Sequence, residues 1–208
     1  MPLQRRKISA VSKEFKNEIK RLKRFDADNQ KRFNSRQIST VQLHFLTEAI
    51  FFRAFRAYER LLRDLFLLYC QEKLHSSGRK AKSYLQPRNF LHSELLIKSS
   101  LKFLDWNNPD IVIQRAELYL MDGFPFKIPL NTYRSELHDY RKIRNHIAHD
   151  SYESWNGYLS VLRKYYRTIP LRIPPPGEFL LLRDRTDPAK YKLLVFFDIM
   201  ENLNSYLS

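Results

Sequence analysis

The sequence predicts an all-α protein. Only 4 glycines and 10 prolines occur among its 208 residues, and the 75 residues from Leu3 to Ser77 contain neither. Both residue types interrupt helices, so their absence from such a long polar stretch favours long helices over strands. Apolar residues also recur at intervals of three or four, which is the spacing of one helix face. Together these observations predict roughly six or seven helices.

The first predicted helix is basic and amphipathic. Its apolar stripe consists of Ile8, Val11, Phe15, Ile19, Leu22 and Phe25. Residues 1–36 hold 12 Lys/Arg and 4 Asp/Glu, which is a net charge of +8 out of +15 for the chain. We therefore treat residues 1–36 as an N-terminal helix or arm and residues 37–208 as a helical domain. Two interpretations stay open: the arm lies along nucleic-acid phosphates, or its lysines only solvate the outer helix face.

A second helix is predicted from about residue 40 to about residue 74. Ser39 and Gln42 have the spacing of a capping box, which starts a helix after a break near Asn34. Residues 45–69 are apolar on more than one face. This segment is therefore expected to be buried against several helices or against a second copy of the chain.

The middle of the chain alternates loops with shorter helices. Residues 75–82 are predicted to form a loop, and residues 90–103 a third helix. Asn108 followed by Pro109 is typical of a cap and first helical position, so a short helix is expected through about residue 120. Residues 122–129 contain Gly and two Pro and are expected to be a turn-rich connector.

The last third is expected to contain three helices separated by a proline-rich stretch. Asn131 or Thr132 is the expected cap of a helix that runs to Ala148. The other expectations, in chain order, are a helix at 154–166, a non-helical stretch at 171–177, a short strand or loop at 179–182, and an apolar helix that begins at Asp187–Pro188 and closes the chain.

Composition excludes several classes of protein. The single cysteine, Cys70, rules out an intrachain disulfide and a zinc ribbon. The N-terminus has no apolar stretch typical of a secretory signal, and no run of about 18 apolar residues would span a bilayer. We therefore expect a cytoplasmic protein with no membrane partner. The charge of +15 favours polyanionic partners, nucleic acid first.

The stretch from Tyr140 to Asp150 carries the most chemistry. It places Arg144, Asn145 and two imidazoles, His146 and His149, near the end of a predicted helix. A guanidinium binds phosphate oxygens as a fork, and an imidazole moves protons near neutral pH. RNA cleavage without metal needs one group that accepts the 2′-hydroxyl proton and one that protonates the 5′ oxygen. Because one motif supplies one well-placed imidazole, a two-fold dimer is expected to supply the second.

The segment Arg144-Asn-His-Ile-Ala-His149 resembles the Arg-Asn-x-x-Ala-His signature of HEPN domains. These are all-α modules that dimerise so that two signatures face a shared cleft, and the resemblance covers roughly residues 40–208. It implies a HEPN-like helical bundle similar to prokaryotic toxin and phage-defence ribonucleases. It also implies that Arg144 binds the scissile phosphate, His149 is the general acid or base, and Asn145 orients the site or contacts RNA. No metal or cofactor is implied; the implied partners are RNA, a second copy, and a cognate antitoxin or a larger defence complex.

Four neighbours of the signature are candidates for lining the site: Tyr140, Arg141, His146 and Tyr152. Some HEPN toxins carry a modifiable Tyr two residues after the His. Here that position is serine and Tyr152 comes one place later, so neutralisation by such a modification is not expected.

Other interpretations of the same residues stay open. A non-catalytic HEPN-like module would bind nucleic acid or a partner protein. The adjacent His149 and Asp150 are also the residue types of a metal-dependent His-Asp phosphohydrolase. In a purely structural role, Asn145 would cross-link backbone and His149 would satisfy a helix C-terminus.

Overall fold

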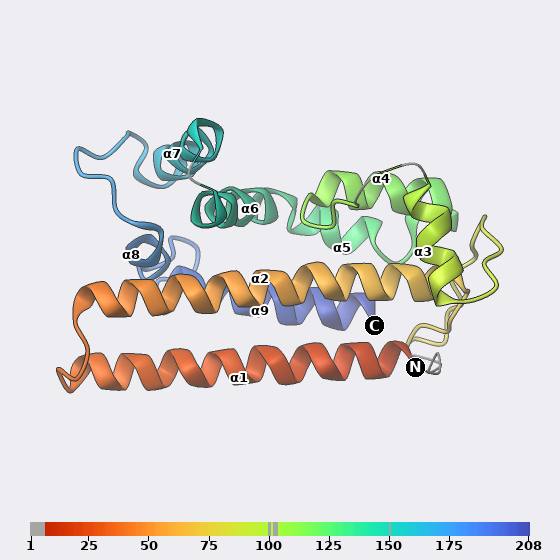
Figure 1. Ribbon diagram of the computed structural model, residues 1–208, viewed down its shortest axis with the longest axis horizontal. Helices are drawn as coiled ribbons and strands as arrows, with labels where there is room; N and C mark the ends of the chain where they lie inside the picture. The colour runs from red at the N-terminus through yellow and green to blue at the C-terminus, as the bar shows by residue number, and fades with distance from the viewer. Residues whose placement is uncertain (1–6, 100, 102–103, 150) are drawn as a thin grey trace. The chain divides into compact units, whose positions relative to one another are not determined.

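The computed structural model describes residues 7–99, 101, 104–149 and 151–208, and within them the all-α prediction is confirmed (Figure 1). These residues form nine α-helices and one 3-10 helix, with only isolated bridges of β type. No helix in this part of the chain combines the length and apolar character needed to cross a membrane.

The chain divides into two compact units. The first takes in residues up to Asn17, Ala57–Arg134 and Glu201–Ser208, and the second takes in Glu18–Arg56 and Ser135–Met200. The helices α1 (Ile8–Asn34), α2 (Thr40–Cys70) and α9 (Lys192–Leu207) contribute residues to both units. The boundary expected at residue 36 stays a prediction.

The start of α2 is set by local chemistry and its end by a change in backbone conformation. The Gln42 amide N–H donates to Ser39 Oγ (3.2 Å), and the Ser39 N–H donates to Gln42 Oε1 (2.8 Å), so the capping box is confirmed. The helix ends at Cys70, before the expected residue 74, because Glu72 takes a left-handed conformation (φ 55°). The N–H of Lys73 then closes the end on the Leu68 carbonyl (3.2 Å).

Most of the apolar stripe expected on α1 is buried: Ile8, Val11, Phe15, Ile19 and Leu22. Phe25 is the exception, with 51% of its surface exposed. Within the second unit, Arg53 of α2 and Lys23 of α1 make ion pairs with Glu18 and Asp198. The basic helix is thus packed into the fold along its apolar face.

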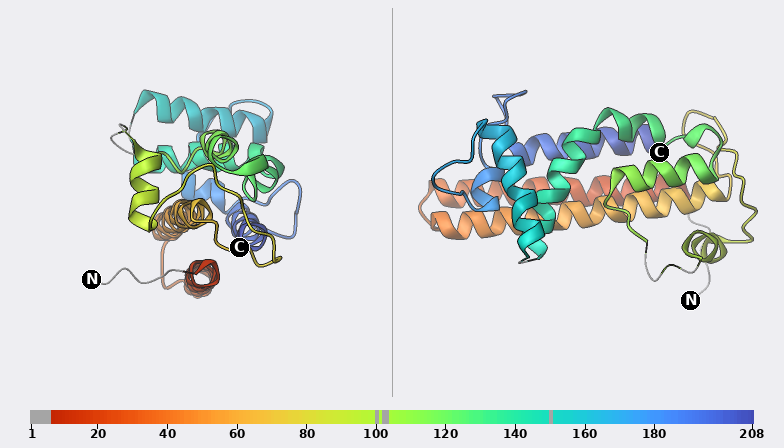
Figure 2. Two further views of the ribbon diagram at one scale, coloured as in Figure 1. Left: turned by 90° about the vertical axis from the view of Figure 1, so that its right-hand side faces the viewer. Right: turned by 90° about the horizontal axis from the view of Figure 1, so that it is seen from above.

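The first unit also contains three short helices, α3 (Phe90–Lys98), α4 (Pro109–Tyr119) and α5 (Lys127–Thr132), with the 3-10 turn η1 (Met121–Gly123) before α5. Asn108 caps α4 as expected, and α5 lies beside α4 (Figures 1 and 2). Residues 122–129 were expected to be a turn-rich connector, but they include parts of η1 and α5. That prediction was therefore wrong in part. Asn131 and Thr132 belong to α5 and do not cap the next helix. Helix α3 ends at Lys98, and the expected extension to residue 103 reaches residues outside the described ranges.

The second unit contains α7 (Tyr152–Tyr166), α8 (Pro176–Leu180) and all of α6 (Arg134–Ala148) except its first residue. Residues 179–182 are not a strand, because the first two belong to α8 and the others continue as a turn. The expected last helix begins at Lys192 because residues 187–190 form a tight turn, closed by the Lys190 N–H on the Asp187 carbonyl (3.0 Å).

Candidate functional site

Helix α6 carries the signature on the flank of its buried face. Leu137, Tyr140 and Ile143 recur at three-residue intervals and are buried, so this stripe fixes the rotation of the helix. Arg144 and Asn145 follow directly and are only partly buried. The core-facing stripe thus places the guanidinium and the amide at the border between the interior and the solvent.

The Arg144 guanidinium is held between two elements of the second unit. It lies over the ring of Phe52 on α2, 5.4 Å from the ring centroid, and its Nη1 donates to Asn145 Oδ1 (3.1 Å). A ring face attracts a cation, and the neighbouring amide adds a directional bond. Phe52 and Asn145 therefore both hold the arginine side chain in the absence of a ligand.

His149 follows the last residue of α6 on a backbone that is fixed at both ends. Its N–H donates to the Asn145 carbonyl (2.9 Å), and its own carbonyl accepts from the Ser154 hydroxyl (2.6 Å). Ser154 is itself locked to Ser151 by the capping box that starts α7. The side chain of His149 is exposed, and it makes no hydrogen bond or ring contact within the described part of the chain. The imidazole is thus exposed, while the N–H and the carbonyl of His149 are both hydrogen-bonded.

His146, the second imidazole of the stretch, is used for packing. Its ring stacks on Tyr158 (4.9 Å between centroids, 15° between planes) and lies 5.3 Å from Trp155. Both partners come from α7, which packs on α6 in this unit. The contacts account for His146 as part of the interface between the two helices.

Tyr140 is a core residue and not a wall of the site. Its ring packs 4.8 Å from Phe196 and 6.1 Å from Phe51, and its hydroxyl donates to the Lys192 carbonyl (3.0 Å). Burial raises the pKa of this hydroxyl well above its ordinary value. With 7% of its surface exposed, the ring has no free face on which a base could stack.

The remaining candidates lie on either side of the signature. Arg141 is partly buried on α6, and Tyr152 begins α7 with 79% of its surface exposed. Asp150, which the phosphohydrolase interpretation requires, lies outside the described residues. Across the described ranges, no three His, Cys, Asp or Glu side chains gather closely enough to hold a metal ion.

Two features of the site were missed from the sequence. The Ser-x-x-Ser pattern at 151–154 is a capping-box spacing that would have placed the start of α7 and the anchor of the His149 carbonyl. Phe52 gave no signal, because one phenylalanine in an apolar helix looks like any other. The structure brings Arg144, Asn145 and Phe52 together, and among described residues it joins His149 to them through the backbone alone.

The chain was compared with family models, curated proteins and solved structures. No family model matches this chain, and no curated protein or solved structure is similar enough to count as a match.

Proposed function

We propose that this protein is a metal-independent endoribonuclease of HEPN type that acts as a homodimer. The observation that carries the proposal is the end of α6, where Phe52 and Asn145 orient Arg144 and where His149 is exposed on a fixed backbone. A site of this kind presents a phosphate-binding fork and a proton-transfer group on one short segment. The net charge of +15 favours a polyanionic substrate such as RNA.

The reaction needs no redox step and no cofactor. Arg144 binds the non-bridging oxygens of the scissile phosphate and stabilises the charge that develops on them. One His149 imidazole accepts the proton of the 2′-hydroxyl while that oxygen bonds to phosphorus. The bond from phosphorus to the 5′ oxygen breaks, and a protonated imidazole donates its proton to the leaving oxygen. The products are a 2′,3′-cyclic phosphate and a 5′-hydroxyl.

Two proton transfers call for two imidazoles, and this explains why the proposal includes a dimer. His146 stacks on Tyr158 and contacts Trp155, so each chain offers one exposed imidazole from the signature, that of His149. A two-fold axis that brings two α6 ends together supplies the acid and the base from equivalent residues. By its resemblance, such an enzyme would serve as a toxin or anti-phage effector in the prokaryotic cytoplasm, held by an antitoxin or a larger complex.

The test compares signature variants with matched controls. Purified wild type, Arg144→Ala and His149→Ala are incubated with a fluorescent RNA in EDTA, and the cleavage ends are identified by their cyclic phosphate. Loss of either group is expected to slow cleavage by about 10²- to 10⁴-fold. Arg163→Ala, an exposed arginine of α7, and His92→Ala on α3 remove the same side-chain types elsewhere and should keep full activity.

The outcomes separate the competing functions. Activity that survives both signature variants would overturn the proposal, and activity that EDTA abolishes would favour the metal-dependent phosphohydrolase. RNA binding without cleavage would identify a non-catalytic module. A composite site also requires the activity per chain to fall when dilution separates the dimer, which light scattering at the same concentrations would follow.

A further inference from the structure

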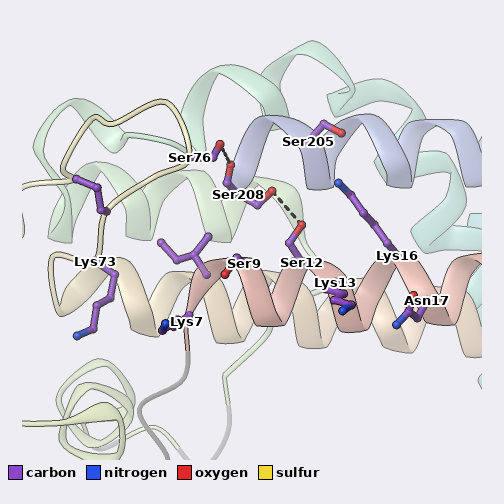
Figure 3. A pocket seen from close by; sticks show the side chains of 12 residues that line it. Lys7, Ser9, Ser12, Lys13, Lys16, Asn17, Lys73, Ser76, Ser205 and Ser208 are labelled. Carbon is purple, nitrogen blue, oxygen red and sulfur yellow. Dashed lines mark hydrogen bonds between the residues drawn. The ribbon is translucent and has the colours of Figure 1, made fainter.

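The first compact unit contains a basic pocket that the chemistry at α6 does not use. It has a volume of about 900 Å³ and lies between the first turns of α1, the segment that follows α2, and the end of α9 (Figure 3). Every residue that lines it belongs to this one unit. The cavity is at the upper end of the range for small-molecule sites, about 300–1,000 Å³.

The charged residues that line the pocket are all lysines. Lys7, Lys13 and Lys16 of the α1 region and Lys73 after α2 line the pocket, and among the residues that the structure describes no Asp or Glu does. Such a concentration of like charge is unfavourable for the protein alone and favourable once an anion binds.

The pocket lysines differ from three lysines of the fold that are paired with carboxylates. Lys80, Lys127 and Lys164 each approach a carboxylate within 2.7 Å, whereas none of the four pocket lysines makes an ion pair with any residue the structure describes. Figure 3 shows Lys16 reaching from α1 towards α9, near Ser205. No described carboxylate is therefore paired with the side chains of the four pocket lysines.

The pocket wall also offers polar groups on a firm frame. Ser12 is 6% exposed and donates to Ser208 Oγ (3.1 Å), and the Ser76 hydroxyl donates to the Ser208 main-chain oxygen. Ser208 in turn donates to the Asn204 carbonyl of α9 (2.7 Å). These bonds tie α1, the segment after α2 and α9 together, so the pocket does not have to be assembled when a ligand enters.

We propose that this pocket binds a small ligand that carries several adjacent phosphate groups. Four ammonium groups exceed what a single phosphate needs, and the volume is larger than one phosphate fills. Within the described ranges no aromatic residue lines the pocket, so these residues offer no stacking platform of the kind with which proteins hold the bases of single-stranded RNA. A compact polyphosphate, alone or as part of a small metabolite, fits both the charge and the size.

Isothermal titration with inorganic tripolyphosphate tests the proposal on the full chain. We expect saturable one-site binding to wild type, weakened about tenfold or more in the double variant Lys16→Ala/Lys73→Ala. The control is Lys20→Ala/Lys31→Ala, which removes two exposed α1 lysines outside the pocket and the same total charge. The control should change the affinity by less than about twofold.

Three results would overturn the proposal. One is a wild type that binds tripolyphosphate no better than it binds an equal concentration of sulfate. Another is an equal loss in both double variants, which would reflect net charge and not the pocket. The third is a pocket variant that loses affinity for a single-stranded RNA and keeps its affinity for tripolyphosphate. Circular dichroism of both double variants verifies that each is folded.

Discussion

Substituting Gly177 with alanine should destabilise the second unit strongly, because this glycine lies directly against the backbone of α2. A Cβ at this position would lie 2.2 Å from the His44 carbonyl oxygen and 2.6 Å from its carbon. Neither atom belongs to a flexible side chain, so α8 would have to move away from α2. That movement would also stretch the bond from the Gly177 N–H to Glu48 Oε1, now 2.8 Å.

The expected cost combines two effects. Overpacking of a tight contact costs about 1–3 kcal/mol, and loss of a hydrogen bond to a charged group costs about 1.5–3 kcal/mol. A free energy of unfolding lowered by roughly 3 kcal/mol corresponds to a melting temperature about 6–12 °C lower for a chain of this length. Burial already raises the pKa of Glu48, and the Gly177 N–H opposes that rise. The pKa of Glu48 should therefore increase further in the variant.

Gly157→Ala is the matched control. A Cβ at residue 157 would meet Lys142 Cγ at 3.6 Å, an ordinary contact, and the position lies inside α7. Replacing a helix-interior glycine by alanine should stabilise the protein by about 0.5–1 kcal/mol. The measurement is the melting temperature of Gly177→Ala, Gly157→Ala and wild type by calorimetry. A Gly177→Ala melting temperature within about 2 °C of wild type would refute the close contact between α8 and α2.

Two further substitutions probe buried polar groups. Tyr140→Phe removes the bond to the Lys192 carbonyl and should lower the free energy of unfolding by about 0.5–1.5 kcal/mol in urea, with RNA cleavage unchanged; a large loss of cleavage would contradict the packing role. Burial raises the pKa of Asp26 above 3.8 even though the Tyr191 hydroxyl donates to it. A raised pKa stabilises the fold most at low pH, and this contribution is lost as pH rises through the folded-state value. We therefore expect urea titrations between about pH 4 and 7 to show that the free energy of unfolding of Asp26→Asn rises relative to that of wild type as pH rises. A difference between the two proteins that does not change with pH would refute this.

Local sequence signals predicted the helix starts that local chemistry sets. The capping box at Ser39 and the Asn108–Pro109 pair act within a few residues of the chain, and both were found where expected. Helix α8 was missed because prolines and a glycine usually favour a loop, although Pro176 occupies the first turn of the helix, where proline is tolerated. Asp187–Pro188 shows the converse error, since a pattern typical of a helix start forms a turn instead.

In the candidate site, too, features set by local sequence were predicted and contacts between distant residues were not. The sequence placed Arg144, Asn145 and His149 on one helix end, but it left open whether Tyr140 faces the core or a ligand. The spacing of Leu137, Tyr140 and Ile143 contained the answer, because residues three apart share a helix face. The contact between Arg144 and Phe52 joins residues 92 positions apart, and no periodicity within one helix encodes it.

The side chains of Arg144 and His149, at the two ends of the signature, differ in how many contacts restrict them. This difference bears on how the proposed site would work. Contacts with Phe52 and Asn145 already restrict the Arg144 side chain, and its bond to the uncharged amide oxygen is weaker than a bond to a charged phosphate oxygen. A phosphate can therefore replace the amide as the partner of the guanidinium at little further entropic cost. His149 is fixed only through its backbone, so its imidazole can turn towards a ribose hydroxyl or a leaving oxygen. In the proposed nuclease, the ordered Arg144 would hold the phosphate while a His149 imidazole from each of two chains would act in turn as base and as acid.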